Sequence, residues 1–343
     1  MRSQLRIVIV LGLAAGLVAL FLRHVDLWRV AADIAQARPA WLLLSVVAAF
    51  GNLAIRAFRW QYLLEPLGSV SYGNAFRATA VGFAANSVLP ARAGEVIRPY
   101  FLARHERMSA TGAFATIVLE RLLDTVTVLV LLASFVLVFG RGMIAANPTV
   151  FRAVEWAGIL AAVGALGALV VLFVLAGDPA RLGRAMARLE RVAPSALAAL
   201  IASVSEKFAV GLGAIRRPSR LLVALAWSFP LWLSIALGIW AAAVAFNIDV
   251  PFTGTFLLMA LLVVGVAVPT PGAIGGFHEA FRLGATMFYG APNDAAVGAA
   301  LVLHAITIGP SLLLGLLFAA QDGLNLSGVR RLAEAPSVEQ HPA

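Results

Sequence analysis

Charged residues are scarce in this sequence. They make up 13% of its 343 residues, whereas hydrophobic residues make up 61%. Soluble domains carry about 25% charged residues, so a water-soluble fold is excluded. Cysteine is absent, which excludes disulfides, thiolate nucleophiles and cysteine metal sites. The five histidines lack the spacing of zinc ligands. We therefore expect neither a metal nor a cofactor, and we expect a membrane protein.

Long apolar runs dominate what is present. Six of them reach or approach the ~20 residues that cross a bilayer: 7–22, 40–55, 113–139, 156–176, 221–246 and 295–320. Two further runs, 74–89 and 252–268, are each followed at once by proline and glycine. Irregular backbone at membrane depth is tolerated only inside protein or beside water. We predict an all-α polytopic integral membrane protein with about six full spans plus two re-entrant or broken helix hairpins.

The charge pattern predicts one orientation in a cytoplasmic (inner) membrane. Segment 177–220 contains eight Lys or Arg and three Asp or Glu, so it should be cytoplasmic. The basic stretch 92–107 should lie on the same side. Counting spans then places both termini in the cytoplasm. The first run is too long for a cleaved signal segment, and we expect it to remain as a span.

We expect a single transmembrane domain over 1–323 and a polar, disordered tail over 324–343. Within 177–220, four apolar residues fall on one helical face and four arginines on the other. This pattern is typical of a helix on an anionic lipid surface, although a solvated connector packed on the bundle is the alternative. The net charge of +9 is interpreted as contact with anionic lipid, because no basic motif with interleaved aromatics indicates nucleic acid.

The two interrupted segments resemble one another. Each contains a proline, then a glycine four residues later, then Glu and Arg. The candidate site residues are Asn86, Pro90, Arg92, Gly94, Glu95 and Arg98 in the first, and Pro271, Gly272, Gly275, Gly276, Glu279 and Arg282 in the second. By the span count they open from opposite sides, which indicates inverted repeats and a binding site near the bilayer midplane. Two ordinary kinked spans are the alternative.

These residue types suit a polar ligand. Proline interrupts the helical hydrogen bonds, and glycine lets backbone approach a ligand closely. Helix N-termini at the breaks would present N–H groups to a phosphate, and Arg92, Arg98 and Arg282 could add paired contacts. Glu95 and Glu279 could pair with arginine, bind an amine or carry a proton.

Three ionisable residues, Glu120, Arg121 and Asp124, lie within an apolar run. Glu120 and Asp124 share a helical face because they are four residues apart. An unpaired charge at this depth costs about 2.5–3.5 kcal/mol, so they should face the bundle interior. We expect partners among Arg92, Arg98 and Arg282. A functional site and a static ion-pair clamp both remain open.

Three further residues are secondary candidates. Arg56 and Arg59 end the second run beside Trp60, and we interpret them as an interfacial belt rather than as a site. His304 lies in the last span and is interpreted as hydrogen-bonded structure, with a proton relay as the alternative.

These motifs resemble the transmembrane domain of the lysylphosphatidylglycerol synthases, also called the flippase-like or UPF0104 family. The resemblance rests on four strings: Arg56-x-x-Arg59-Trp60; Asn86-x-x-Leu89-Pro90-x-Arg92-x-Gly94-Glu95-x-x-Arg98; Glu120-Arg121-x-x-Asp124; and Pro269-x-Pro271-Gly272-x-x-Gly275-Gly276-x-x-Glu279. In the two-part synthases this domain is linked to moving aminoacylated phosphatidylglycerol between leaflets. The resemblance therefore implies a lipid-handling domain. We expect a stand-alone member without the aminoacyl-transferase domain.

Three functions remain. The first is a translocase (flippase) that moves a charged phospholipid or polyprenyl-linked lipid between leaflets. The second is a non-transporting membrane partner of a lipid-synthesis enzyme. The third is an embedded head-group transferase, although the sequence contains no Asp-x-Asp metal motif and no glycine-rich nucleotide loop. We therefore expect the chain not to be an enzyme.

Overall fold

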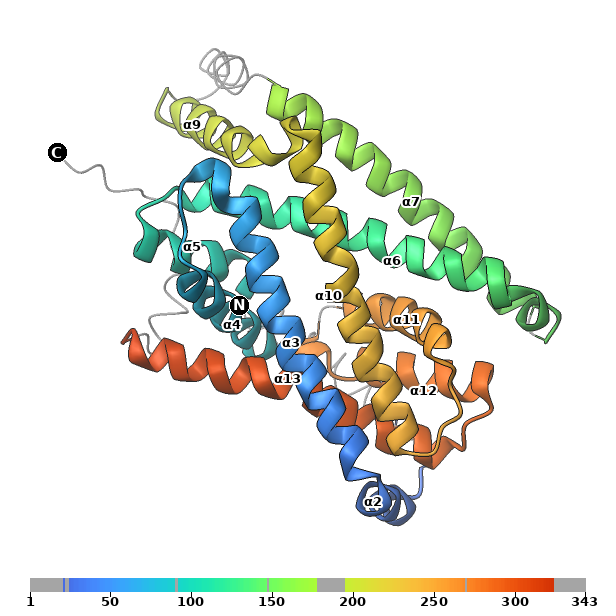
Figure 1. The fold of residues 1–343 in the computed structure, drawn as a ribbon. Coiled ribbons are helices and arrows are strands. Elements are labelled where there is room, and N and C mark those ends of the chain that lie inside the picture. Colours follow the sequence, from blue (N-terminus) through green and yellow to red (C-terminus); the bar gives the residue numbers. More distant parts are fainter. Residues whose placement is uncertain are drawn as a thin grey trace.

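The computed structural model describes residues 21, 25–89, 92–146, 148–177, 195–268 and 270–323. The described secondary structure is entirely helical (Figure 1). Five described helices are long and apolar enough to cross a membrane. The chain is therefore a multi-pass helical membrane protein. Almost all of the predicted first span, the amphipathic face of 181–192, Pro90 and the tail 324–343 lie outside the described residues.

Local signals in the sequence define the helix boundaries. Pro39 and Pro218 occupy first-turn positions, where the missing N–H costs nothing. Ser71 begins α4 by accepting a hydrogen bond from the Asn74 amide at 3.2 Å. The described helices are α2 (Leu27–Gln36), α3 (Pro39–Leu64), α4 (Tyr72–Val88), α5 (Gly94–Glu106), α6 (Ala110–Ala146), α7 (Pro148–Gly177), α9 (Ser195–Gly211), α10 (Pro218–Ala245), α11 (Thr255–Ala267), α12 (Gly276–Tyr289) and α13 (Asn293–Gln321).

Two sets of helices repeat the same order in opposite directions. The first consists of α3, the hairpin α4–α5 and α6, and the second of α10, the hairpin α11–α12 and α13. Helices α3 and α10 pack antiparallel: Ser45 Oγ donates to the Gly238 carbonyl at 2.9 Å, and Asn52 Nδ2 to the Leu231 carbonyl at 3.0 Å. Figure 1 also shows α6 and α13 running in opposite directions. These opposite directions are what inverted repeats would give.

Both interrupted segments are helix–break–helix hairpins. The Glu106 carboxylate accepts from the Ser71 amide at 2.9 Å and from Asn74 Nδ2 at 2.8 Å, so the end of α5 returns to the start of α4. In the second hairpin the Tyr289 hydroxyl donates to the Gly254 carbonyl at 2.8 Å. Each hairpin therefore begins and ends on one side of the bundle.

Glycines let the two arms of each hairpin pack closely. A Cβ at Gly94 would overlap the Gly82 carbonyl oxygen, and one at Gly276 would overlap the Gly265 carbonyl oxygen. These glycines were expected to admit a ligand to the backbone. The structure corrects this for Gly94 and Gly276, which bring two helices together instead. Small residues commonly allow such contacts in membranes, where lipid gives apolar side chains no reason to associate.

The tips of the two hairpins meet. Arg92 Nη2 in the first break donates to the Val266 carbonyl near the end of α11 at 3.2 Å. A Cβ at Gly272 in the second break would lie 3.3 Å from the Ser87 carbonyl oxygen. The two breaks, 180 residues apart in the chain, are therefore neighbours in space.

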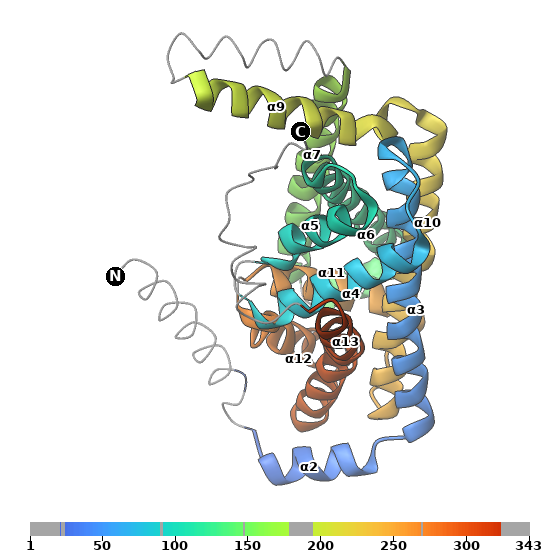
Figure 2. The same cartoon turned by 90° about the vertical axis from the view of Figure 1, so that its left-hand side faces the viewer.

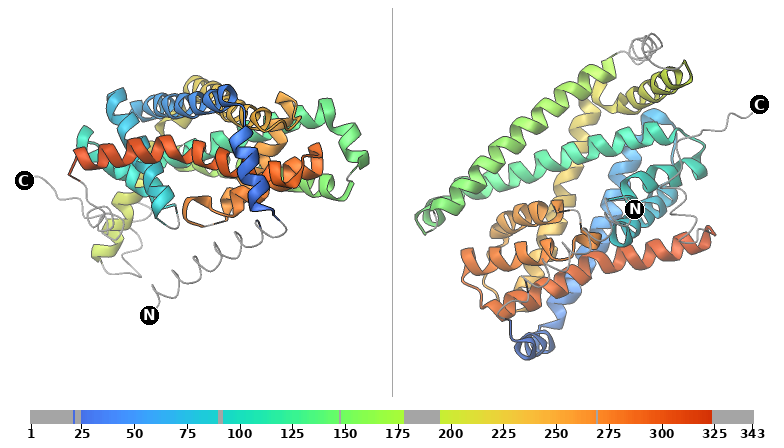
Figure 3. Two further views of the ribbon diagram at one scale, coloured as in Figure 1. Left: turned by 90° about the horizontal axis from the view of Figure 1, so that it is seen from below. Right: turned by 180° about the vertical axis from the view of Figure 1, so that it is seen from behind.

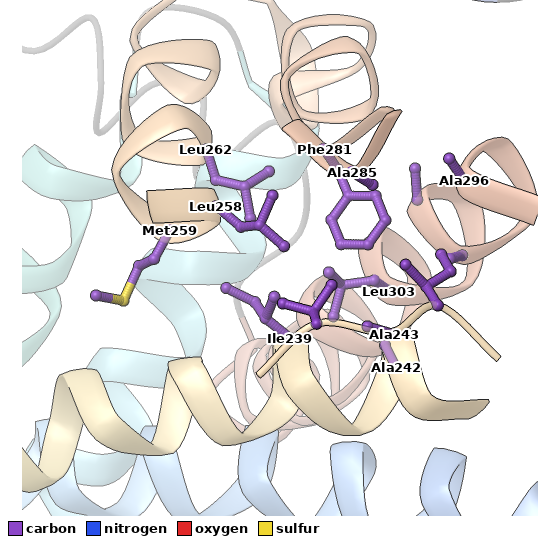
Figure 4. Packing of buried hydrophobic residues seen from close by; sticks show 14 of the residues in the cluster. Ile239, Ala242, Ala243, Leu258, Met259, Leu262, Phe281, Ala285, Ala296 and Leu303 are labelled. Carbon is purple, nitrogen blue, oxygen red and sulfur yellow. The ribbon is translucent and has the colours of Figure 1, made fainter. Parts of the chain in front are cut away.

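The largest apolar core surrounds the second hairpin. In Figure 4, Phe281 of α12 points toward Leu258 of α11 and Ile239 of α10, with Leu303 of α13 beside them. Alanines of α10 and α13 complete this core and keep the helices close. Helix α7 lies instead at the edge of the bundle beside α6 (Figure 3), and most of its large apolar side chains are exposed, as expected for contact with lipid.

The helix ends fall into two groups. The Arg38 amide at the start of α3 donates to the Ala245 carbonyl at the end of α10, at 3.0 Å. At the other end, Glu65 after α3 forms an ion pair with Arg220 at the start of α10. In Figure 2 the two ends of the α3–α10 pair lie at opposite ends of the bundle, one near α2 and the other near α9. The end of α5, which bonds to Ser71, and the described segment 195–220 both lie at this second end of the bundle.

Candidate functional site

Six charged side chains meet inside the first repeat, and we call them the buried ion network. They are Arg56 and Arg59 of α3, Arg98 of α5, and Glu120, Arg121 and Asp124 of α6. Glu120 lies at its centre and is fully buried. Its Oε1 is within 3.3 Å of nitrogens from all four arginines. The shared face of Glu120 and Asp124 thus points into the bundle, as expected.

Arg56 and Arg59 are not an interfacial belt, and that interpretation was wrong. Helix α3 continues beyond the apolar run to Leu64, so both arginines lie within the span. Their exposed fractions are 4% and 0%. Arg56 Nη1 donates to Glu120 at 3.2 Å and to Asp124 at 3.3 Å, and Arg59 Nη1 donates to Asp124 at 2.7 Å. The carboxylates on α6 offset the free-energy cost of burying the two arginines.

Arg98 presents an unpaired edge. Its Nη1 meets both Glu120 oxygens, at 3.1 and 3.3 Å, and its guanidinium carbon lies 3.8 Å from the centroid of the Trp60 ring. Its Nε and Nη2 are buried without a hydrogen-bond partner among the described residues. The Nε–Nη2 edge is one of the forks with which arginine binds carboxylate or phosphate.

A row of charged side chains leads outward from the network. The Arg121 side chain is 36% exposed and contacts Glu120 and Asp124. Its Nε lies 3.9 Å from the Glu95 carboxylate. The same carboxylate lies 3.9 Å from Nη1 of Arg92, whose side chain is half exposed. Arg121, Glu95 and Arg92 therefore connect the buried arginines with the surface near the first break.

Helix α10 of the second repeat also supports the network. Ser228 Oγ accepts from Arg59 Nη1 at 2.6 Å, and Trp232 Nε1 donates to Asp124 Oδ1 at 3.0 Å. The sequence analysis missed both residues. The available signal was weak: a serine and a tryptophan on one face of an apolar helix, four residues apart.

The network is unbalanced in charge. It contains four guanidinium groups and two carboxylates, a net charge of +2. Including Arg92 and Glu95 leaves this excess unchanged. Burying an arginine at the bilayer centre costs about 2.5–3.5 kcal/mol on insertion scales. Surplus positive charge at this depth favours an anionic ligand over a self-contained clamp.

The second break is chemically different, and two expected partners do not reach the network. Arg282 Nε donates to Glu279 at 2.8 Å and Arg282 Nη1 to Asn293 at 3.0 Å. Arg92 pairs with Glu95, and no ion pair joins it to Glu120 or Asp124 within the described chain. The expected pairing of Arg98 with Glu120 is observed, whereas the pairings of Arg92 and Arg282 were wrong. The repeats share a backbone plan but carry different charges.

The first backbone amides of α5 are already satisfied. Asn86 Oδ1 accepts from the Gly94 amide at 2.8 Å, and the next amides bond to carbonyls at positions 92 and 93. The expectation that this helix N-terminus offers N–H groups to a ligand is therefore wrong for α5. Arginine side chains remain as the anion-binding groups of the first repeat.

The second break is tied to α13 by histidine. Pro271 begins a 3₁₀ turn that includes Gly272 at φ +59° and is followed by Gly275 at φ +88°, backbone that favours glycine. His304 Nε2 bonds to the Gly272 carbonyl at 2.7 Å. His278, which the sequence analysis did not single out, accepts from the Gly275 amide at 3.2 Å. No cluster of three metal-ligating side chains occurs in the described segments.

Two helix hairpins that meet beside a buried ionic cluster define a polytopic helical membrane protein with interrupted helices. Residues 5–315 match the family described as the lysylphosphatidylglycerol synthase TM region. The chain belongs to this family, which supports a membrane role related to lipids.

Individual relatives match over shorter stretches. A UPF0104 membrane protein of Methanothermobacter thermautotrophicus is 30% identical over 128 residues, 36% of this chain and 37% of the relative. One from Methanocaldococcus jannaschii is 28% identical over 105 residues, 30% of this chain and 31% of the relative. The glycosyltransferase AglD of Haloferax volcanii is 28% identical over 130 residues, 37% of this chain and 21% of that protein. The matches thus span about a third or less of each relative.

Proposed function

We propose that this protein moves a phosphate-bearing lipid between the leaflets of the cytoplasmic membrane. The observation that carries the proposal is the net positive charge of the buried ion network. A phospholipid or polyprenyl phosphate supplies the missing negative charge on a head group, and its acyl or prenyl chain remains in the lipid. Membership of the family supports a lipid substrate.

The geometry supports a route for the head group. Arg92 is half exposed and Arg121 is partly exposed, whereas the other arginines of the buried ion network are buried. Arg92 and Arg121 would therefore meet the phosphate first. The unpaired edge of Arg98 would then take two phosphate oxygens as a bidentate contact. Its Nη1 would remain on Glu120, which holds the guanidinium plane in position together with Trp60. Movement of the second hairpin against the first would open the other side, as in alternating access.

The proposal includes an orientation and partners. The open end of the first hairpin would face the cytoplasm and that of the second hairpin the outside, with both chain termini in the cytoplasm. Basic segment 177–220 would face the anionic cytoplasmic leaflet. The chain would make and break no covalent bonds, so it would not be an enzyme.

Reconstitution tests the proposal. The purified protein would be placed in vesicles of phosphatidylcholine and phosphatidylglycerol that contain a trace of acyl-labelled phosphatidylglycerol. We expect label to change leaflet faster than in empty vesicles, and Arg98→Gln to reduce the rate by tenfold or more, about 1.4 kcal/mol for one lost ionic contact. Arg77→Gln is the matched control, since Arg77 pairs peripherally with Asp322. Rates equal to those of empty vesicles, also with labelled polyprenyl phosphate, would overturn the proposal.

The match to a protein named a glycosyltransferase favours one alternative. The chain could be a membrane partner of a lipid-modifying enzyme and transport nothing itself. Under that alternative, Glu95→Gln, Glu120→Gln and Arg98→Ala would all retain function in cells if the proteins still fold. Loss of function in folded Arg98→Ala protein would favour translocation.

A further inference from the structure

A pair of histidines lies at the second break, away from the buried ion network. The ring centroids of His278 on α12 and His304 on α13 are 4.4 Å apart. His278 is buried, and the phenyl rings of Phe21 and Phe277 flank the pair, each 5.1 Å from one imidazole. The network and the proposed head-group route use neither histidine.

Hydrogen bonds assign the protons of both rings. A carbonyl only accepts, so His304 Nε2 carries hydrogen toward Gly272, and its Nδ1 holds a lone pair. An amide only donates, so His278 Nδ1 is unprotonated against the Gly275 amide and its Nε2 carries the hydrogen. These bonds require a neutral His278 ring, and they leave His304 Nδ1 as the nitrogen that can take up or release a proton without breaking either bond.

A second proton would have a different effect. Protonation of His278 Nδ1 would remove the acceptor of the Gly275 amide and release the bond that closes the start of α12. Gly272, three residues earlier, is the carbonyl that His304 holds, and it lies against Ser87 of the first hairpin. Protonation would thus loosen the second break where it touches the first.

Other charges around the pair are already engaged or distant. Helix α11 has no titratable side chain. His304, whose ring centroid lies 4.4 Å from that of His278, is the titratable group in contact with it. Most charged groups on the described elements packed against α12 and α13 have partners of their own: Glu279 with Arg282, Arg77 with Asp322, Arg29 with Asp26, Arg220 with Glu65, and Arg56 and Arg59 within the buried ion network. The Asp294 carboxylate accepts from the Asp26 amide, and Asp33 of α2 forms no ion pair among the described residues.

We infer that His278 and His304 form a proton-binding site that couples proton uptake to movement of the second hairpin. The ligand is a proton from water on one side of the membrane, taken up first at His304 Nδ1. Phenyl faces can stabilise the imidazolium that forms. As a coupling device the site rests on the proposed translocation, whereas proton binding itself does not.

Two measurements test the inference. First, the purified full-length protein labelled with ¹⁵N-histidine is titrated in detergent micelles, with signals assigned from His278→Gln and His304→Gln. We expect the two rings to titrate as a coupled pair, and the midpoint of each to rise when the other is replaced, because a neighbouring positive charge is removed. Independent titration, with no effect of either replacement, would overturn the inference.

Second, transport of labelled phosphatidylglycerol is measured against pH and under an imposed proton gradient. We expect the wild-type rate to rise with acidity on a limiting slope of about tenfold per pH unit for each proton linked to the movement. Glutamine can keep each hydrogen bond without taking a proton, so both glutamine variants should lose this slope. His105→Gln is the control, since His105 pairs with Asp322 elsewhere.

The failures are distinguishable. A protein that transports lipid with the same pH response in all variants overturns proton coupling and leaves the translocase intact. A protein with coupled histidine titration that moves no lipid overturns the proposed function and supports the proton site alone. Thermal melting of each variant identifies misfolding, and His304→Asn then serves as the second substitution that cannot be protonated near neutral pH.

Discussion

At the residue scale, the central feature is a carboxylate shared by several arginines. Glu120 Oε1 lies within reach of Arg56, Arg59, Arg98 and Arg121. Removing one member breaks its contacts with groups that stay buried, which is costlier than losing an exposed pair. The position of each member in this cluster therefore predicts how a substitution behaves.

Arg59→Met gives the sharpest stability prediction. Arg59 is fully buried and supplies the 2.7 Å contact to Asp124, so its loss should destabilise the fold by about 3–5 kcal/mol. Thermal unfolding in detergent measures the effect. Arg92→Met is the control and should change stability by about 0–1 kcal/mol, since its ion pair is half exposed and 3.9 Å long. Equal effects of the two substitutions would contradict the description of the network.

Sequence reasoning at this scale succeeded for one helix and failed between helices. The i, i+4 spacing of Glu120 and Asp124 and the free-energy cost of unpaired charge were enough to turn them inward. The same reasoning misplaced Arg56 and Arg59, because the apolar run ends before them although the helix does not. It also missed Ser228, Trp232 and His278, whose partners lie on other helices.

At the element scale, the hairpins depend on close contact between their arms. Gly94→Ala should destabilise the protein markedly, because the new methyl group would overlap the Gly82 carbonyl oxygen. Gly51→Ala in α3 is the matched control. A Cβ there meets nothing within 4 Å, and alanine favours helix by about 0.5–1 kcal/mol. Melting temperatures should fall for Gly94→Ala and stay level or rise for Gly51→Ala; a stable Gly94→Ala protein would argue against the observed packing.

The open end of the first hairpin should respond to acid. Burial acts to raise the pKa of Glu106, but hydrogen bonds from Asn74 and Ser71 outweigh it and hold that pKa below its ordinary value. A depressed pKa means that the carboxylate form stabilises the fold above the ordinary value of about 4.3, and that this contribution is lost as pH falls through the folded-state value. Glu106→Ala should be less stable than wild type at neutral pH and indistinguishable in strong acid, as measured by thermal melting. A difference that persists at low pH would contradict this.

At the whole-molecule scale, the proposed orientation can be tested directly because the chain contains no cysteine. Arg104 near the end of α5 and Asp249 after α10 are both exposed and should lie on opposite sides of the membrane. A membrane-impermeant maleimide should label Asp249→Cys in intact cells and Arg104→Cys only after permeabilisation. The reverse pattern would invert the proposed orientation and the direction of access to the buried ion network.

Sequence alone determined the class of this protein and its helical plan. Composition excludes a soluble fold, and apolar length with Pro/Gly interruptions predicts both spans and hairpins, since these properties act locally along the chain. Tertiary structure alone decided that Arg56 and Arg59 join the network, that Arg282 does not, and that two histidines meet at the second break. Spacing within one helix defines a face, but only packing between helices decides which faces meet.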